Sequence, residues 1–457
     1  MFPRHPSPNR PASAQRKPPV EATPGFLPRW IASQAILDAL IKGKPFEERF
    51  GGENDANSRG LDARDRALAR SIATVGLRRL GTIRKALLKF LDKGMPKKAG
   101  PLEGVLIAAA AQLLFMEASD HAAVDLAVRA TRNDPASMPF AALANAVLRN
   151  IARNKAELLE SSDPLDDDTP AWLAQRWRNR YGETTARAIA AAHRNEPTLD
   201  LTVKGDPEGW AKRLGGRALP TGSVRLDTHA AIPELEGYAA GEWWVQDAAA
   251  ALPAQLAALS PGDRALDLCA APGGKAAQLA QAGASVVALD RSAERLKRLA
   301  GNLARLNLSV ELAIADAMTY QAPPFDFTLL DAPCSATGTI RRHPDVAWTK
   351  RAGDIVSLAK AQSELLDRAV ALTKPGGVLV YCTCSLEPEE GENQIADLMR
   401  RNPDVSRVPV EASEIGGLDE CVSRDGDLRT LPCHLVADTP RQSGLDGFFA
   451  ARLKKRA

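Results

Sequence analysis

The chain has 457 residues, of which 45% are hydrophobic and 25% are charged, and its formal net charge is only +3. This composition lets most of the chain fold, its length allows two to four domains, and the small charge excess does not by itself indicate a nucleic-acid partner. The longest apolar run, residues 105–116, is too short to cross a membrane, and the N-terminus lacks a signal-peptide core. Six cysteines are too few for a disulfide framework, so we expect a cytoplasmic protein with reduced thiols.

The N-terminal third predicts a tail followed by a helical bundle. Residues 1–24 are basic and rich in proline, which favours a disordered tail. Such a tail could attract RNA weakly, or it could be solvated and have no function. Residues 25–160 form the predicted all-α domain, in which no catalytic constellation is visible. Its expected helices are 30–41, 62–80, 82–92, 105–116, 121–131 and 140–152, of which 105–116 is apolar nearly all round and should be central.

Residues 161–238 predict a linker and a small α+β segment. The linker is acidic and flanked by prolines, at residues 161–170. Apolar spacing then predicts helices at 171–181, 183–193 and 208–214 and strands at 199–204 and 224–226. A strand at 243–246 opens the third region, residues 239–457. The helix expected after it, 247–259, should be started or kinked by Pro253 rather than hold it in its middle.

The third region is organised around residues 264–275. An apolar strand at 265–269 runs into Pro272-Gly273-Gly274, and a helix follows from Lys275. A glycine turn between a strand and a helix lets backbone come close to a ligand, although such a turn alone also fits an ordinary connection. Four further strands each end in an acid or a cysteine: 286–290, 312–316, 325–331 and 378–384. Helices are expected at 293–305, 355–372 and 389–401. Two more strands, 405–410 and 447–454, can complete the sheet.

This alternation predicts a Rossmann-like α/β domain with its ligand at the carboxyl ends of parallel strands. Asp290 ends the second strand a little under 20 residues after the glycine turn, where such folds place the acid that holds ribose hydroxyls. Asp316 and Asp331 end the next two strands. One such acid could be a helix cap, but several in register favour a binding site.

Two cysteines, Cys334 and Cys384, also follow strand ends and should face the same pocket. Each could be a small buried side chain. A thiolate that adds to carbon 6 of a pyrimidine makes carbon 5 nucleophilic enough to accept an electrophilic methyl group, and the base must be unstacked to be reached. Spacing does not decide which thiol attacks. Cys382 is a third thiol of the last strand, for which we expect a packing role.

Three motifs carry a resemblance to a known family. They are Asp267-Leu-Cys-Ala-Ala-Pro-Gly-Gly-Lys275, Asp331-Ala-Pro-Cys-Ser-Ala-Thr-Gly338 with Arg341-Arg342-His343-Pro344-Asp345, and Tyr381-Cys-Thr-Cys-Ser-Leu-Glu-Pro-Glu-Glu390. The region that contains them resembles the NOL/NOP/Sun family of RNA cytosine-C5 methyltransferases. Residues 67–79 and 145–151 of the helical region are similar to the NusB-type RNA-binding domain. The resemblance implies a multidomain chain: an N-terminal all-α NusB-like bundle, a small α+β linker domain and a C-terminal Rossmann-like class I methyltransferase domain.

The resemblance also implies roles for individual residues. Cys384 would be the nucleophile and Cys334 would assist product release, with Asp331 between cofactor and cytosine and Lys275 beside them. The cofactor would be S-adenosylmethionine, leaving as S-adenosylhomocysteine, with its methionine end held by the loop. Asp290 would bind the ribose, Asp316 the adenine amino group, and Arg341 and Arg342 RNA phosphates. The loop residues are Cys269, Ala270, Ala271, Pro272, Gly273, Gly274 and Lys275.

The function expected from this resemblance is methylation of carbon 5 of a cytosine in 16S ribosomal RNA, by a monomer without a metal. The same chemistry on transfer RNA or another RNA is an alternative. A non-catalytic RNA-binding or assembly factor is another, which the paired cysteines and the complete cofactor loop disfavour. The sequence does not identify the target nucleotide, the assembly state of the RNA or the role of the tail.

Overall fold

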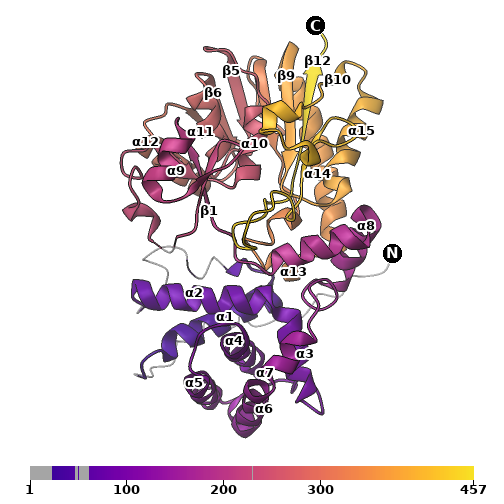
Figure 1. Ribbon diagram of the computed structural model, residues 1–457. Coiled ribbons are helices and arrows are strands. Elements are labelled where there is room, and N and C mark those ends of the chain that lie inside the picture. Colours follow the sequence, from indigo (N-terminus) through magenta and orange to yellow (C-terminus); the bar gives the residue numbers. More distant parts are fainter. Residues whose placement is uncertain (1–22, 47–49, 51–60, 229) are drawn as a thin grey trace, which may run out of the picture. The chain divides into compact units, whose positions relative to one another are not determined.

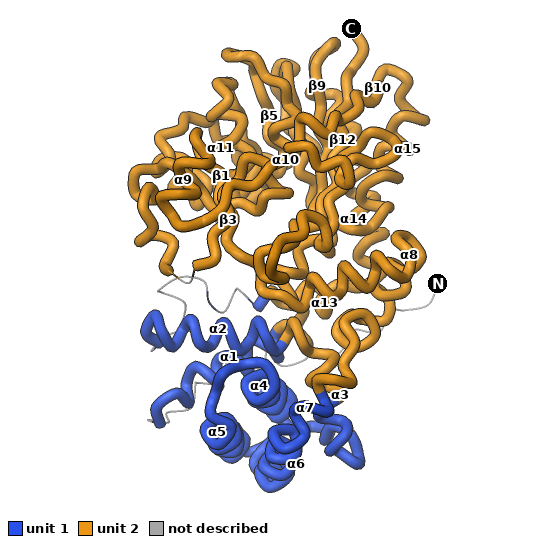
Figure 2. Tube along the Cα trace, in the orientation of Figure 1, with its two compact units in different colours: residues 1–38, 46–76, 86–158 blue, residues 39–45, 77–85, 159–457 orange. Residues whose placement is uncertain are grey.

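The computed structural model describes residues 23–46, 50, 61–228 and 230–457, so the predicted tail lies almost wholly outside the described residues. The chain divides into two compact units (Figure 2). The first contains residues up to 38, 46–76 and 86–158, and the second contains residues 39–45, 77–85 and 159–457. The domain boundaries predicted above at 24, 160 and 238 stay predictions.

The first unit is helical, which confirms the predicted all-α region. Helix α4 is its central element: nearly all of its side chains are buried, as expected for a helix that is apolar on every face. A Cβ atom on Gly104 of α4 would lie 2.5 Å from the carbonyl oxygen of Ser33, so only glycine lets α1 and α4 approach this closely. No helix among the described residues is long and apolar enough to span a bilayer. The helices of this region are α1 (Phe26–Lys42), α2 (Ala63–Arg78), α3 (Leu80–Lys89), α4 (Leu102–Phe115), α5 (Asp120–Arg132), α6 (Ala141–Arg153) and α7 (Lys155–Glu160).

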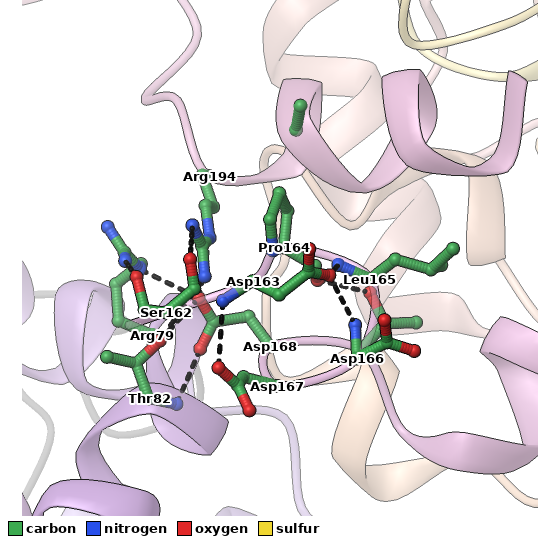
Figure 3. A network of polar contacts seen from close by, with 12 residues as sticks. Arg79, Thr82, Ser162, Asp163, Pro164, Leu165, Asp166, Asp167, Asp168 and Arg194 are labelled. Carbon is green, nitrogen blue, oxygen red and sulfur yellow. Dashed lines mark hydrogen bonds and ion pairs between the residues drawn. The ribbon is translucent and has the colours of Figure 1, made fainter. Parts of the chain in front are cut away.

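The acidic segment 161–170 is held by specific side-chain contacts (Figure 3). Its Asp168 is nearly buried and accepts hydrogen bonds from Nε of Arg79 at 2.8 Å and Nε of Arg194 at 2.7 Å. The backbone N–H of Thr82 donates to the same carboxylate at 2.7 Å. The acidic side chains that predicted a linker therefore fix this segment to Thr82 of the helix Leu80–Lys89 and to Arg79 and Arg194, which lie directly beside helix ends.

The backbone of the same segment is equally fixed (Figure 3). Asp163 accepts hydrogen bonds from the backbone N–H groups of Leu165 at 2.9 Å and Asp166 at 2.8 Å, which closes a tight turn. Leu165 is fully buried. A Cβ atom on Gly81 would lie 1.6 Å from the carbonyl oxygen of Asp167, so the two backbones touch without an intervening side chain. The segment is an ordered turn and not a free tether.

A kinked helix and a small sheet follow. Helix α8 (Ala171–His193) has two halves that meet at Gly182, whose φ of +79° breaks the helix where the sequence predicted two separate helices. The sheet has the antiparallel order β2-β3-β1-β4, and β4 pairs with β1 instead of joining the larger sheet. Its elements are β1 (Leu199–Val203), α9 (Pro207–Leu214), β2 (Arg217–Ala218), β3 (Ser223–Leu226) and β4 (Trp243–Val245).

The larger sheet confirms the predicted Rossmann-like architecture as a mixed sheet. Its order is β10-β12-β9-β8-β5-β6-β7, with β11 also paired to β12. Strands β9, β8, β5, β6 and β7 are parallel, whereas β12 runs antiparallel to β9 and to its other partners. The strands are β5 (Arg264–Leu268), β6 (Ser285–Asp290), β7 (Glu311–Ile314), β8 (Phe325–Asp331), β9 (Thr373–Thr383), β10 (Val405–Arg407), β11 (Leu428–Thr430) and β12 (Phe448–Lys455).

Helices cover both faces of this sheet (Figure 1). Helices α10, α11 and α12 pack on one face, and α14 and α15 pack on the other, because successive strand residues point to opposite sides. Leu266 and Leu268 of β5, for example, face α14, whereas Ala265 faces α10. These helices are α10 (Ala248–Gln255), α11 (Gly274–Gln281), α12 (Ala293–Arg305), α14 (Ala352–Leu372) and α15 (Glu392–Arg401), whereas the short helix α13 (Val346–Thr349) packs with α8.

The prediction for Pro253 is wrong. Proline lies inside α10, in its last turn, and neither starts the helix nor marks a kink. Asp247 caps the start instead, accepting a hydrogen bond from the backbone N–H of Ala249 at 2.9 Å. The helix ends at Gln255, short of the predicted residue 259, and the φ of +48° at Ala258 is incompatible with a continuing helix.

His193, the last residue of α8, is a buried base in an unusual setting. Its ring packs edge-on against Trp177, with 5.3 Å between ring centroids. Within the described residues, its Nε2 atom has no hydrogen-bond partner. Burial, together with the positive charges of Arg341 and Arg78, lowers the pKa of His193 to about 3.

We expect this histidine to make the second unit sensitive to acid. The folded protein keeps His193 neutral, whereas the unfolded chain takes up a proton below its ordinary pKa of 6.5, so this contribution to stability is present above pH 6.5 and is lost as the pH falls towards 3. Because of this histidine, the free energy of unfolding should fall by about 2 kcal/mol between pH 8 and pH 5.

Urea unfolding followed by tryptophan fluorescence measures this effect, since six of the seven tryptophans (all but Trp30) lie in the second unit. The His193→Phe variant keeps a ring against Trp177 but cannot ionise. Between pH 8 and pH 5 the free energy of unfolding of this variant should fall by about 2 kcal/mol less than that of the wild type. Equal losses in both proteins would contradict the buried neutral histidine.

Candidate active site

A cavity of about 710 Å³ opens where β5, β8 and β9 reach their carboxyl ends. The strand ends supply Asp267, Asp331 and Cys384 to its wall, and the small sheet supplies Trp244 and Val245. Of the predicted site residues, those lining the cavity are Ala270, Pro272, Gly273, Gly274, Lys275, Asp331, Arg342 and Cys384. Cys269, Ala271, Asp290, Asp316, Cys334 and Arg341 lie outside this lining.

The two predicted cysteines are brought together. The Sγ atoms of Cys334 and Cys384 lie 3.4 Å apart, because each follows one of two neighbouring parallel strands, β8 and β9. The hydrogen bond to Cys384, and then burial, hold the pKa of Cys334 well above its usual value. Cys334 is therefore a protonated thiol that can donate to the sulfur of its neighbour.

A lysine–aspartate pair lies beside the thiols. Nζ of the buried Lys275 is 2.8 Å from Oδ2 of Asp331, whose side chain is one-third exposed. Burial alone would lower the pKa of Lys275, but the charge of Asp331 raises it above its usual value, so the lysine stays charged. Cys382 is paired with Asp331 across β8 and β9, and its Sγ lies 3.5 Å from Oδ1 of that aspartate. It packs in the core, as predicted, and also supports the pair.

Asp267 is the most unusual acid of the cavity. It is 1% exposed, and within the described residues only the backbone N–H of Ala276 acts on its carboxylate as a hydrogen-bond donor, beyond the usual hydrogen-bond geometry. Burial, and then the charge of Asp331, hold its pKa well above the usual range. A buried carboxylate with so few partners is costly, so this acid can still accept hydrogen bonds from a donor or a cation.

Asp290, at the end of β6, fixes the backbone of the predicted cofactor loop. Asp290 is buried at the end of β6 and accepts hydrogen bonds from the backbone N–H groups of Ala271 at 3.3 Å and Ser292 at 2.9 Å. Gly273 has φ of +107°, and a Cβ atom there would lie 2.6 Å from Cγ of Leu299, so only glycine fits this turn.

The other predicted ligand of the cofactor is placed differently. Asp316 is exposed, and its Oδ1 accepts a hydrogen bond from the backbone N–H of Met318 at 2.9 Å. It lies beyond the end of β7, the edge strand of the parallel part of the sheet. A contact with an adenine amino group therefore stays a prediction.

The two predicted phosphate ligands are engaged by acids. Arg341 is 3% exposed, and its Nη1 donates to the carbonyl oxygen of Ser443 at 2.9 Å. Arg342 lines the cavity and binds Asp446 through Nε at 3.1 Å and also Asp247. The structure thus gives both arginines a role in holding the cavity wall, and their contact with RNA phosphates stays a prediction.

Sequence reasoning missed Glu390. This fully buried residue accepts hydrogen bonds from the backbone N–H and the hydroxyl of Ser335, with 2.9 Å for the first. It also accepts from the hydroxyl of Ser385 at 2.6 Å and from Nε2 of Gln362 at 3.1 Å. The serines directly follow the two cysteines, and this repeated Cys-Ser pair was the signal that could have pointed to a shared partner.

Both the sequence and the fold match known proteins. The family model described as "16S rRNA methyltransferase RsmB/F" matches residues 254–454, and that of the NusB family matches residues 27–153. Ribosomal RNA small subunit methyltransferase B of Xylella fastidiosa (strain Temecula1) is 35% identical over 450 residues, covering 94% of this chain and 98% of the relative. The protein of the same name from Cronobacter sakazakii is 33% identical, with 94% and 98% covered.

Solved structures agree on the fold. The crystal structure of PH0851 has a TM-score of 0.71 and 24% identity, and the match covers 95% of this chain and all of that one. A methyltransferase homolog protein from Pyrococcus horikoshii has a TM-score of 0.52 and 28% identity, with 62% of this chain and 94% of that chain covered.

Proposed function

This chain belongs to the family of ribosomal RNA small subunit methyltransferase B, and we propose that it transfers a methyl group from S-adenosylmethionine to carbon 5 of a cytosine in 16S ribosomal RNA. The observation that carries the proposal is the pair of thiols 3.4 Å apart: Cys384 lines the cavity together with Lys275 and Asp331, and Cys334 lies directly behind it, outside the lining. One pair of strands thus provides both a nucleophile and a group that assists its release. We expect a cytoplasmic monomer.

The residues around the cavity fit the proposed cofactor, which would supply the methyl group as an electrophile on a positively charged sulfur. The loop from Cys269 to Lys275 would hold its methionine end, Asp290 the ribose hydroxyls and Asp316 the adenine amino group. Asp267 supports this assignment, because its buried carboxylate, which only the backbone N–H of Ala276 approaches as a donor, would accept hydrogen bonds from a cationic ammonium group. Binding a cation there would offset the cost of burying that acid.

The chain's own residues would carry the reaction on the base. The thiolate of Cys384 adds to carbon 6 of the cytosine, and the electron pair of the 5,6 double bond moves to carbon 5, which takes the methyl group. The proton on carbon 5 then passes to a water molecule, its electron pair restores the double bond, and the Cys384 thiolate is expelled. Cys334, which can donate a hydrogen bond to that sulfur, stabilises the departing thiolate. Asp331, fixed by Lys275, orients the base between thiol and cofactor.

Product analysis tests the proposal. The full chain is incubated with unmodified 16S RNA and methyl-labelled S-adenosylmethionine, and the RNA is digested to nucleosides for mass spectrometry. We expect label only in 5-methylcytidine and at one position of the RNA. A transfer RNA pool treated in parallel should stay unlabelled. Label in another nucleoside, label in transfer RNA alone, or tight RNA binding without any methyl transfer would each overturn it.

A further inference from the structure

A second cluster of sulfur, nitrogen and oxygen atoms lies in the second unit, outside the cavity. Glu420 and Cys421 belong to the short helical turn Asp419–Cys421, and His434 lies 13 residues further along the chain. Sγ of Cys421 is 3.3 Å from Nδ1 of His434. A carboxylate oxygen of Glu420, the sulfur of Cys421 and a ring nitrogen of His434 all lie within 4.8 Å of one another.

We propose that Glu420, Cys421 and His434 form a zinc site with water in the fourth position. A tetrahedral zinc ion with Zn–S of about 2.3 Å and Zn–N of about 2.0–2.1 Å places its sulfur and nitrogen ligands about 3.5 Å apart. The observed 3.3 Å is close to that separation, so only a small adjustment is needed. Thiolate, imidazole and carboxylate groups are the usual ligands of zinc in proteins.

The ligands differ in burial in a way that suits metal entry. Cys421 is buried, His434 is half-buried and Glu420 is exposed, so the cluster opens to solvent on one side. Backbone groups already orient two of them: Leu435 N–H donates to Glu420 at 3.2 Å and Leu431 N–H donates to Nδ1 of His434 at 3.2 Å. The metal would displace the second of these bonds, since Nδ1 has one lone pair.

A metal here would brace the active site without taking part in its chemistry. Residues 421–434 contain β11, whose Arg429 donates a hydrogen bond from Nη1 to the carbonyl oxygen of Ser385 at 2.5 Å. Ser385 directly follows Cys384. Zinc would join the two ends of residues 421–434, the segment that binds the backbone directly after Cys384. The site does not rest on the proposed methyl transfer and was not expected from the sequence, because only the course of β11 brings its members together.

Metal binding is tested on the full chain in a Cys334→Ala/Cys384→Ala background, which removes the other pair of neighbouring thiols that could bind metal. Cobalt serves as an optical probe for zinc, because a thiolate ligand gives it a charge-transfer band. We expect one zinc ion per chain by elemental analysis after dialysis against micromolar zinc, and one cobalt ion with that band. His121→Ala, a histidine of the first unit, is the matched control and should change neither result.

Three variants decide the outcome. Cys421→Ser should abolish the charge-transfer band, and His434→Ala should lower zinc affinity at least 10-fold. Glu420→Gln changes an exposed side chain, so it should leave the fold intact while also weakening zinc at least 10-fold. Absence of bound zinc in the background protein, or a cobalt band that Cys421→Ser leaves unchanged, would overturn the proposal.

Discussion

Replacing Cys384 by alanine will abolish methyl transfer, whereas replacing Cys334 by alanine will trap the protein on its RNA. Without Cys384 no thiolate reaches carbon 6, and loss of a covalent nucleophile lowers turnover by at least about 10³-fold. Without Cys334 addition and methylation proceed, but the Cys384 sulfur loses the partner that lies 3.4 Å away and leaves slowly. A denaturing gel with labelled 16S RNA and S-adenosylmethionine should therefore show a slow-moving adduct for Cys334→Ala only.

Cys382→Ala is the matched control for this experiment. It removes a buried thiol that lies two residues from Cys384 in sequence and contacts Asp331. It should turn over without trapping an adduct. An adduct with Cys384→Ala in place of Cys334→Ala would exchange the two roles, and no adduct with any variant, despite methyl transfer, would contradict covalent catalysis.

The sheet and most of its helices follow from local patterns. Helix α12 occupies the predicted residues 293–305 and β8 the predicted residues 325–331, because an amphipathic helix and a buried strand are each determined by apolar spacing within one segment. The convergence of Cys334, Cys384 and Asp331 was predictable for the same reason, since carboxyl ends of parallel strands share one edge of a sheet.

Features that depend on distant partners were not predictable. Strand β4 has the apolar character of a central strand, but it pairs with β1, more than 40 residues earlier in the chain. Asp168 belongs to a stretch whose acidity suggested a linker, and only the position of Arg79 and Arg194 makes it a structural anchor. Arg341 follows a motif that suggested phosphate binding, yet it is buried in an ionic cluster. In each case the partner's identity, and not the segment's own pattern, determines the role.

Glu390 is the clearest case of such a residue, and it supports the geometry on which the proposed chemistry depends. It accepts four hydrogen bonds, from the backbone and side chain of Ser335, from the hydroxyl of Ser385 and from Nε2 of Gln362. One carboxylate thereby holds the turns after both cysteines. A displacement of about 1 Å between reacting groups can cost about 10²-fold in rate.

We therefore expect Glu390→Ala to lower turnover at least about 10²-fold and to destabilise the second unit by about 3 kcal/mol or more, because four buried donors lose their acceptor. Glu390→Gln keeps the shape and one oxygen and should fall between this variant and the wild type. Glu389→Gln is the matched control: the neighbouring glutamate is partly exposed and pairs with Arg176, so its loss should change turnover less than about 2-fold.

Turnover is measured well below the unfolding temperature, so that stability and positioning separate. The decisive readout is the rate of adduct formation when each Glu390 substitution is combined with Cys334→Ala, since adduct formation reports the attack of Cys384 alone. A merely structural glutamate would lower the unfolding temperature and leave that rate unchanged in the folded protein, which would contradict the positioning role. A slower attack at saturating RNA, with KM nearly unchanged, is the result expected if Glu390 sets the separation of the two thiols.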